Sequence, residues 1–197
     1  MTNDKARVYK GNRPLSASRL NRSGLKQGTI APAFTLPLLD GGQVSLDAYR
    51  GKRVMIVFSD PKCKPCHALM PELAKLHRRT PDIEILIISR GNIDAVRAEF
   101  AARPVPFPVA VQKSWEISRR YAMFATPIAY VIDDAGKIAG DVAVGPEPIL
   151  ILLANAQVFA LVKTIKEHRD SLMRQAKAAR AAVRKEAPAR TRQKANH

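Results

Sequence analysis

The segment that decides the fold reads R-V-M-I-V-F-S-D-P-K-C-K-P-C over residues 53–66. Its first half, Arg53–Ser59, is short, apolar and rich in β-formers, which predicts a strand buried on both faces. The residues that follow, 66–79, carry leucines at helical spacing and basic residues near the end, which predicts a helix. Two cysteines therefore lie at the junction of a buried strand and a helix.

The sequence on either side extends this alternation. Residues 34–38 and 43–46 flank Asp40-Gly41-Gly42 and predict a hairpin. The later pattern predicts strands at 83–88, 107–111 and 128–132, helices at 92–102 and 114–122, and a returning hairpin strand at 137–144. Pro148 opens a last helix, and its apolar run from Ile149 to Val162 predicts burial in the core. The order predicts an α/β fold in which a central mixed β-sheet carries helices on both faces, with an added N-terminal β-hairpin.

The net charge of +16 is concentrated at the two ends of the chain. Residues 1–28 hold seven Lys/Arg against one acid, and residues 163–197 hold eleven against three, so residues 29–162 are almost neutral. This distribution predicts a basic flexible N-terminal arm over 1–28, a folded domain over 29–162 and a basic tail over 163–197. The tail is predicted to be helical until Pro188 and disordered after it.

The N-terminal residues contain no apolar run of about 7–15 residues, as a secretory signal would, and no stretch of about 18 apolar residues predicts a membrane span. We therefore expect a cytoplasmic protein. Two cysteines in a reducing compartment are unsuited to a structural staple. They are better explained by redox chemistry or metal binding.

The spacing Cys63-Lys64-Pro65-Cys66 favours redox chemistry. At the start of a helix, unpaired backbone N–H groups and the helix dipole stabilise an anion, and Lys62 and Lys64 add positive charge. These effects favour the thiolate of Cys63, and only the thiolate attacks a disulfide. Cys66 lies one turn further along and can resolve the resulting mixed disulfide, while Pro65 stiffens the loop.

Three other interpretations of the pair are weaker. Inert structural cysteines would not need flanking lysines. A zinc site built from Cys63, Cys66, His67 and His77 would require His77 to reach back eleven residues along one helix. The string C-x-x-C-H also matches haem attachment, which requires export. We expect no metal and no cofactor, with His67 beside the site and His77 at the solvated end of the helix.

Further motifs accompany the cysteines: Pro71 inside the helix, Thr126-Pro127 at the start of a strand, and D-D-A-G-K-I over 133–138. With A-P-A-F-T-L-P-L-L-D-G-G-Q-V-S-L, R-G-K-R-V-M-I-V-F, F-P-V and T-P-I-A-Y-V-I-D-D-A-G-K-I, the chain from about Ile30 to Val162 resembles the thioredoxin-like superfamily in its AhpC/TSA and TlpA-like redoxin branch. The resemblance implies a thioredoxin fold, a cis peptide bond at Thr126-Pro127, and a substrate groove beside the cysteines. We predict that Lys64, Pro65, Thr126 and Pro127 contact substrate there.

The chain departs from this family's pattern at several positions. Lys62 replaces a tryptophan common before the first cysteine, Val57 replaces a buried aspartate, and Leu69 stands where a TlpA-like glutamate can stand. The group that accepts the proton of the resolving cysteine is therefore open. Asp60 occupies the place of the Thr or Ser that precedes a peroxidatic cysteine, so the peroxidase pattern is not met.

We predict a thiol–disulfide oxidoreductase that reduces protein or small-molecule disulfides through Cys63 and Cys66, with a cellular thiol reductant restoring the dithiol. A thiol-dependent peroxidase with antioxidant activity is the first alternative. The second is a redoxin-fold protein that binds nucleic acid or an anionic membrane through its basic tails, a contact that would be non-specific. The spacing of Trp115 and Tyr121 predicts that both belong to the core.

Overall fold

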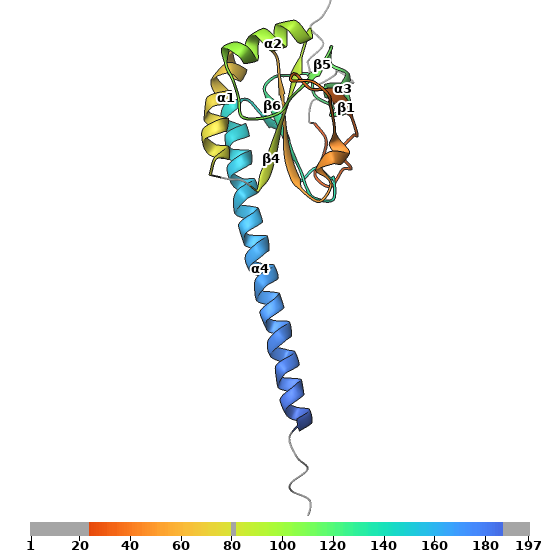
Figure 1. The fold of residues 1–197 in the computed structure, drawn as a ribbon, viewed down its shortest axis with the longest axis vertical. Coiled ribbons are helices and arrows are strands. Elements are labelled where there is room, and N and C mark those ends of the chain that lie inside the picture. Colours follow the sequence, from red (N-terminus) through yellow and green to blue (C-terminus); the bar gives the residue numbers. More distant parts are fainter. Residues whose placement is uncertain (1–23, 80–81, 187–197) are drawn as a thin grey trace, which may run out of the picture. The chain divides into compact units, whose positions relative to one another are not determined.

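The computed structural model describes residues 24–79 and 82–186 (Figure 1). The chain divides into two compact units, residues 1–153 and 154–197, and each is described here by itself. Most of the predicted N-terminal arm and the end of the predicted tail lie outside the described residues. The predicted domain limits at 28/29 and 162/163 stay predictions.

The first unit is built on a five-stranded mixed sheet in the order β5-β4-β3-β6-β7. Its central strand, β3 (Arg53–Ser59), runs parallel to β4 (Ile83–Arg90) and antiparallel to β6 (Ile128–Ile132). At the edges, β5 (Val109–Gln112) is parallel to β4, and β7 (Ala143–Val144) is antiparallel to β6. The predicted α/β class and mixed sheet are therefore confirmed.

Alternate residues of each strand point to opposite faces of the sheet. On one face Val54, Ile56 and Phe58 enter a core cluster with residues from the N-terminal hairpin and from α3 (Glu116–Arg120). The hairpin, which the sequence predicted, pairs β1 (Thr35–Pro37) with β2 (Gln43–Ser45). It leads into the short 3-10 helix η2 (Leu46–Tyr49).

The other face of the sheet is covered by α1 (Lys64–His77), α2 (Ile93–Ala102) and the first turns of α4 (Pro146–Glu186) (Figure 1). Leu69 and Leu73 of α1 are fully buried there, and Ile149 and Leu153 anchor α4. Helices therefore lie on both faces, as predicted.

Burial within α4 differs from the sequence prediction. The apolar run Ile149–Val162 was expected to be a core helix, but Ile151, Val158 and Val162 are each more than half exposed. The helix also begins at Pro146 rather than Pro148 and continues without a break to Glu186. Apolar composition alone does not tell which neighbours cover a helix, so the prediction of burial was wrong beyond the first turns.

Two further boundaries differ. The returning strand predicted over 137–144 is reduced to the two residues of β7, with an isolated bridge between Ile132 and Ile138. Packed residues also precede Ile30, near which the family resemblance begins. Leu25 packs against the core, and its N–H donates to the Tyr130 hydroxyl at 3.1 Å.

No helix in the described part of the chain combines the length and the hydrophobicity that crossing a bilayer requires.

Candidate active site

The two cysteines occupy the turn between β3 and α1. Cys63 is the N-cap of α1, and its sulfur accepts the backbone N–H of Cys66 at 3.1 Å. The two sulfurs are joined in a disulfide bond, with Cα atoms 5.2 Å apart. The sulfur of residue 63 therefore stands where a helix start favours negative charge.

The two cysteines differ in exposure. Cys63 is half-buried, whereas Cys66 is only 1% exposed beneath the first turn. An incoming disulfide would therefore meet Cys63 first, and the buried Cys66 would remain available for an attack from within. The prediction that residue 63 is the nucleophile and residue 66 the resolving cysteine is compatible with this asymmetry and stays a prediction.

The helix begins two residues earlier than the sequence predicted, at Lys64 rather than Cys66. The reason is local: Cys63 supplies the cap, and Pro65 falls in the first turn, where a proline lacks no needed N–H. Pro71 lies inside the helix, as the sequence indicated. Lys64 and Pro65 are consequently exposed helix-start residues next to Cys63.

Thr126 and Pro127 are distant from the cysteines in the sequence but lie at the same end of the sheet, where β3 ends. Pro127 immediately precedes β6, whose first residue, Ile128, pairs with Phe58 near the end of β3. The Thr126-Pro127 peptide bond is cis, as the family resemblance implied. Pro127 is buried and its carbonyl accepts the N–H of Gly145 at 2.9 Å, while Thr126 is half-buried.

Asp60 and Arg90 were not predicted as partners. The Asp60 carboxylate, only 9% exposed, forms an ion pair with the Arg90 guanidinium at the end of β4. Its other oxygen accepts the N–H of Lys62 at 2.8 Å, which holds the loop that leads into Cys63. A charged residue at the end of a buried strand next to β3 is the sequence signal that could have pointed to Arg90.

Trp115 lies at the same end of the sheet as Asp60 and Arg90 rather than in the core. Arg90 lies over its ring, 4.4 Å from the centroid, and the ring of Phe124 follows at 6.1 Å. Trp115 is half-buried and Phe124 is 38% exposed, so the prediction that Trp115 is a core residue was wrong. Tyr121 is fully buried, as predicted.

The two histidines of α1 have different roles. The His67 ring nitrogen Nε2 lies 2.9 Å from the Pro61 carbonyl and 3.1 Å from the Glu99 carboxylate. Because both neighbours only accept hydrogen bonds, Nε2 carries a proton. His67 therefore ties the start of α1 to α2 and to the loop before Cys63.

His77 was predicted to lie at the solvated end of the helix, and this was wrong. Its Nε2 lies 2.9 Å from the Ile83 carbonyl, and its ring packs edge-on against Phe107 at 5.1 Å. Within residues 24–79 and 82–186, no cluster of three or more His, Cys, Asp or Glu side chains could hold a metal ion.

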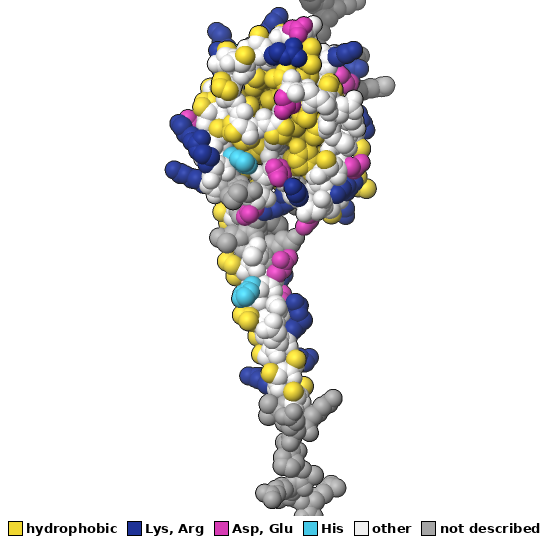
Figure 2. All heavy atoms as spheres, in the orientation of Figure 1, with side chains coloured by type: hydrophobic (Ala, Val, Ile, Leu, Met, Phe, Trp, Pro, Cys, Tyr) yellow, Lys and Arg dark blue, Asp and Glu magenta, His cyan; other side chains and the backbone are white. Residues whose placement is uncertain are grey.

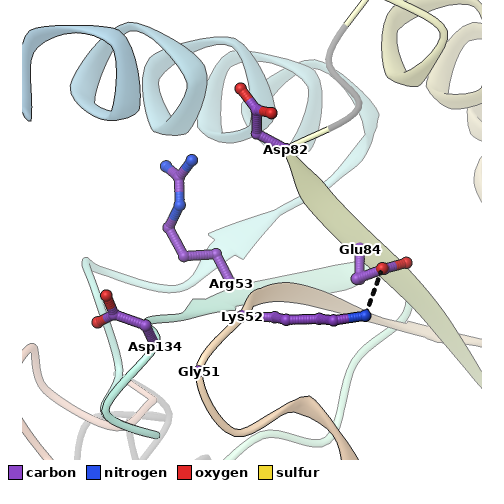
Figure 3. Close-up of a pocket in the computed structure, with 6 residues that line it drawn as sticks. All are labelled: Gly51, Lys52, Arg53, Asp82, Glu84 and Asp134. Atoms are coloured by element: carbon purple, nitrogen blue, oxygen red, sulfur yellow. Dashed lines mark hydrogen bonds and ion pairs between the residues drawn. The ribbon is translucent and has the colours of Figure 1, made fainter. Parts of the chain in front are cut away.

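A recess of about 320 Å³, whose lining residues Figure 3 shows, lies near the start of β3, at the other end of the sheet from the cysteines. Its lining consists of Gly51, Lys52, Arg53, Asp82, Glu84 and Asp134. Arg53 is the first residue of β3, six positions before Ser59, so the recess is roughly 20 Å from the cysteine edge. Its walls are charged and partly neutralised, for example by the Lys52–Glu84 pair at 3.4 Å. It is not part of the site.

Comparisons with known proteins agree with this geometry. Residues 27–140 match the AhpC/TSA family. The chain is 30% identical over 118 residues to the thiol-disulfide oxidoreductase ResA of Bacillus thuringiensis subsp. konkukian, a match that covers 58% of this chain and 68% of that protein. It is also 30% identical over 128 residues to the thioredoxin-like protein YneN of Bacillus subtilis, covering 62% and 74%.

Solved structures share the fold. The thioredoxin domain of a thiol-disulfide oxidoreductase from Bacteroides vulgatus superposes with a TM-score of 0.61 at 20% identity, over 68% of this chain and 99% of that one. A thiol:disulfide interchange protein from a Bacteroides species gives 0.59 at 21% identity, over 68% and 91%. At these identities the superpositions establish the thioredoxin fold and nothing further.

A thioredoxin fold with a C-x-x-C pair at a helix start, together with these relatives, defines a thioredoxin-like thiol–disulfide oxidoreductase. Within that class, the chain belongs to the AhpC/TSA family.

Proposed function

We propose that this protein reduces disulfide bonds in other proteins, with Cys63 as the attacking sulfur and Cys66 as the resolving sulfur. The observation that carries the proposal is the unequal exposure of the two cysteines at the start of α1. ResA and the structural neighbours are named for thiol–disulfide chemistry, which supports the same class of substrate.

In its first half, the reduction of the substrate disulfide, the reaction needs no reductant other than the dithiol of the protein itself. The Cys63 thiolate attacks one sulfur of the substrate disulfide, and the other substrate sulfur leaves as a thiolate. Cys66 then loses its proton and attacks Cys63, which releases the second substrate thiol and leaves Cys63–Cys66 oxidised. A cellular thiol reductant returns the pair to the dithiol by the same exchange in reverse.

Residues at the cysteine edge would hold the substrate chain in this mechanism. Thr126 and Pro127 come directly before Ile128, which pairs with Phe58 near the end of β3, and Lys64 and Pro65 form the exposed start of α1. The Asp60–Arg90 ion pair would keep the loop before Cys63 in place while the two sulfurs exchange partners. We assign Arg90 a positioning role, because its guanidinium acts through Asp60.

Insulin reduction by the full chain tests the proposal. Cys63→Ser is expected to abolish activity, whereas Cys66→Ser is expected to accumulate a mixed disulfide that mass spectrometry places on residue 63. A trapped adduct on residue 66 in the Cys63→Ser variant, or undiminished turnover in both variants, would reject the assignment. Circular dichroism of each variant separates a chemical loss from unfolding.

Redox equilibration measures the direction of the reaction. Incubating the protein in glutathione buffers of graded ratio and alkylating the free thiols gives the reduction potential of the pair. A potential close to that of reducing thioredoxins, about −270 mV, is expected for a disulfide reductase. A potential near −120 mV, typical of strong oxidants, would instead indicate disulfide formation in substrates.

Peroxidase activity, contact of the basic tails with polyanions, and a cytoplasmic location stay predictions. Hydrogen peroxide consumption with a thiol donor is expected to be no faster than with a free thiol, because Asp60 is committed to Arg90 at the position where a peroxidase carries Thr or Ser. A salt titration of nucleic-acid binding tests the predicted role of the basic tails. Cell fractionation tests the predicted location.

A further inference from the structure

The exposed apolar side chains of the described residues gather on one helix. Six of the nine large hydrophobic residues that are strongly exposed belong to α4. Figure 2 shows hydrophobic and basic side chains interspersed along the described part of this helix. Exposed apolar side chains that gather on one element are typical of an interaction surface.

The spacing of these residues is regular. Ile151, Val158, Ile165 and Leu172 follow one another at intervals of seven, and each is between 51% and 62% exposed. A second row begins four residues after the first and repeats with the same interval, as Asn155, Val162, Arg169 and Ala176. Alternating steps of four and three residues define a heptad repeat, and this one continues to Ala179, so it spans four heptads.

A strict seven-residue repeat favours another helix over a flat surface. A straight α-helix drifts by about 20° per heptad, so a heptad stripe winds around the helix and stays in register only with a partner that supercoils. A membrane-bound helix would also have to bury Asn155 and Arg169, which stand in line with the apolar residues. In a coiled coil, a polar residue at such a position sets register and oligomeric state at a cost in stability.

We propose that α4 pairs in solution with the α4 of a second copy of this chain, as a parallel two-stranded coiled coil. A second copy carries the same repeat at the same length, and Asn155 would face its own counterpart only in a parallel, in-register pair. Residues 151–179 would form a contact about 43 Å long.

The flanking charges are compatible with parallel pairing. In that arrangement the residue just before each member of the second row faces the residue five positions further along the second helix. His168 would face Met173 of the second copy, and Gln175 would face Arg180. These contacts oppose no two Lys/Arg side chains. Arg169 does face its own counterpart, which weakens the dimer and raises the protein concentration needed to populate it.

The molecular mass of the full chain in solution tests the dimer. The monomer has a mass of 21.7 kDa, and light scattering during gel filtration is expected to give twice this value at micromolar concentration. The double variant Ile165→Glu, Leu172→Glu is expected to weaken the dimer at least about tenfold, because four charges would enter the contact. Ser171→Glu, Ala178→Glu adds the same charge one position away from the stripe and should remain dimeric.

Orientation requires a second measurement. In a Cys63→Ser, Cys66→Ser background, Val162→Cys is expected to form a disulfide with itself under mild oxidation, since facing residues of a parallel pair lie within disulfide reach. Ser171→Cys is the outward-facing control. A dimer that fails to cross-link at residue 162 would overturn the parallel arrangement.

Two results would overturn the proposal as a whole. One is a monomer at every concentration with helical content unchanged. The other is a monomer that sediments with phosphatidylserine-containing vesicles and loses this binding in Ile165→Glu, Leu172→Glu, which would assign the stripe to a membrane surface instead.

Discussion

The Asp60 carboxylate, three residues before the first cysteine, is paired with the Arg90 guanidinium from the neighbouring strand. Asp60 is almost covered, and Arg90 in turn lies against the Trp115 ring. One ion pair therefore connects the loop that leads into α1 with the end of β4 and with the start of α3.

Removing Arg90 should destabilise the fold, because it leaves a nearly buried carboxylate without its partner. We expect Arg90→Gln to lower the free energy of unfolding by about 1–3 kcal/mol, measured by urea denaturation. Asp60→Asn should recover part of this loss in the double variant. Arg97→Gln is the matched control: its pair with Asp94 is exposed, so its cost should be under about 1 kcal/mol. Equal costs at Arg90 and Arg97 would contradict the prediction.

Substrate charge should matter at the cysteine edge. Lys62 and Lys64 are exposed, and within the described residues their ammonium groups have no ion-pair partner, whereas Asp60 is neutralised. We expect the reduced protein to reduce oxidised glutathione, an anion, faster than cystamine, a dication, with the preference fading in high salt.

Lys64→Glu should reduce this preference by about threefold or more, measured from stopped-flow rates for the two disulfides. Lys137→Glu makes the same charge change in the hairpin after β6, at the opposite edge of the sheet, and should leave the preference intact. Equal effects of the two variants would show that the whole chain, rather than the site, attracts the anion.

Tyr130 joins the N-terminal segment to the sheet. Its hydroxyl donates to the Tyr121 carbonyl at 2.7 Å and accepts the N–H of Leu25 at 3.1 Å. Tyr130→Phe should therefore lower the free energy of unfolding by about 1–3 kcal/mol at neutral pH. Tyr49→Phe removes a half-buried hydroxyl with no hydrogen bond among the described residues, and it should cost less.

The loss at Tyr130 should depend on pH. Burial raises the pKa of Tyr130 above its ordinary value of 10.0, outweighing the backbone hydrogen bond from Leu25. Its contribution is therefore complete below pH 10 and is lost as the pH rises through the folded-state pKa. Urea titrations on both sides of pH 10 should show the gap between parent and Tyr130→Phe closing in alkali. A gap that does not change with pH would contradict this.

The pKa of Glu116 is shifted in the opposite direction, downward. Burial alone raises its pKa, but backbone N–H groups of Glu116, Ser114 and Lys113 and the Lys113 charge outweigh burial, so the pKa lies below its ordinary value of 4.5. Its stabilising effect is present above pH 4.5 and is lost as the pH falls through the folded-state pKa.

Glu116→Gln should therefore cost a small amount, under about 1 kcal/mol at pH 7 for so exposed a side chain, and nothing in stronger acid. Thermal unfolding across this pH range measures the difference. Glu147→Gln, an exposed change in the first turn of α4, serves as the control. A difference between parent and Glu116→Gln that grows as the pH falls would disprove the assignment.

The parts of the fold that could be predicted are those where a local pattern has one structural solution. The bounds of β3 and β6 were predicted to the residue, because short β-branched runs between turn residues suit only a buried strand. The cysteine pair was recognisable for the same reason: its spacing, the lysines and Pro65 all lie within five residues.

Other features depend on contacts that no local pattern contains. Asp60 and Arg90 are thirty residues apart and meet only because β3 and β4 run parallel with Ser59 opposite Ser89. The position of Trp115 at the site edge follows from Arg90 and could not be read from its own neighbours. The position of His77 was predicted wrongly because its hydrogen-bond partner, the Ile83 carbonyl, belongs to the next strand, β4, and not to the helix itself.

The hydrogen bond between Leu25 and Tyr130 bears on how the chain can be shortened. The family match begins at residue 27, and a cut made there would discard Leu25 and expose the apolar surface it covers. Gly24 itself has no room for a larger side chain, since an added Cβ would stand 2.7 Å from the Val142 side chain. A trimmed protein that keeps its native stability should therefore start no later than Gly24 and retain that glycine.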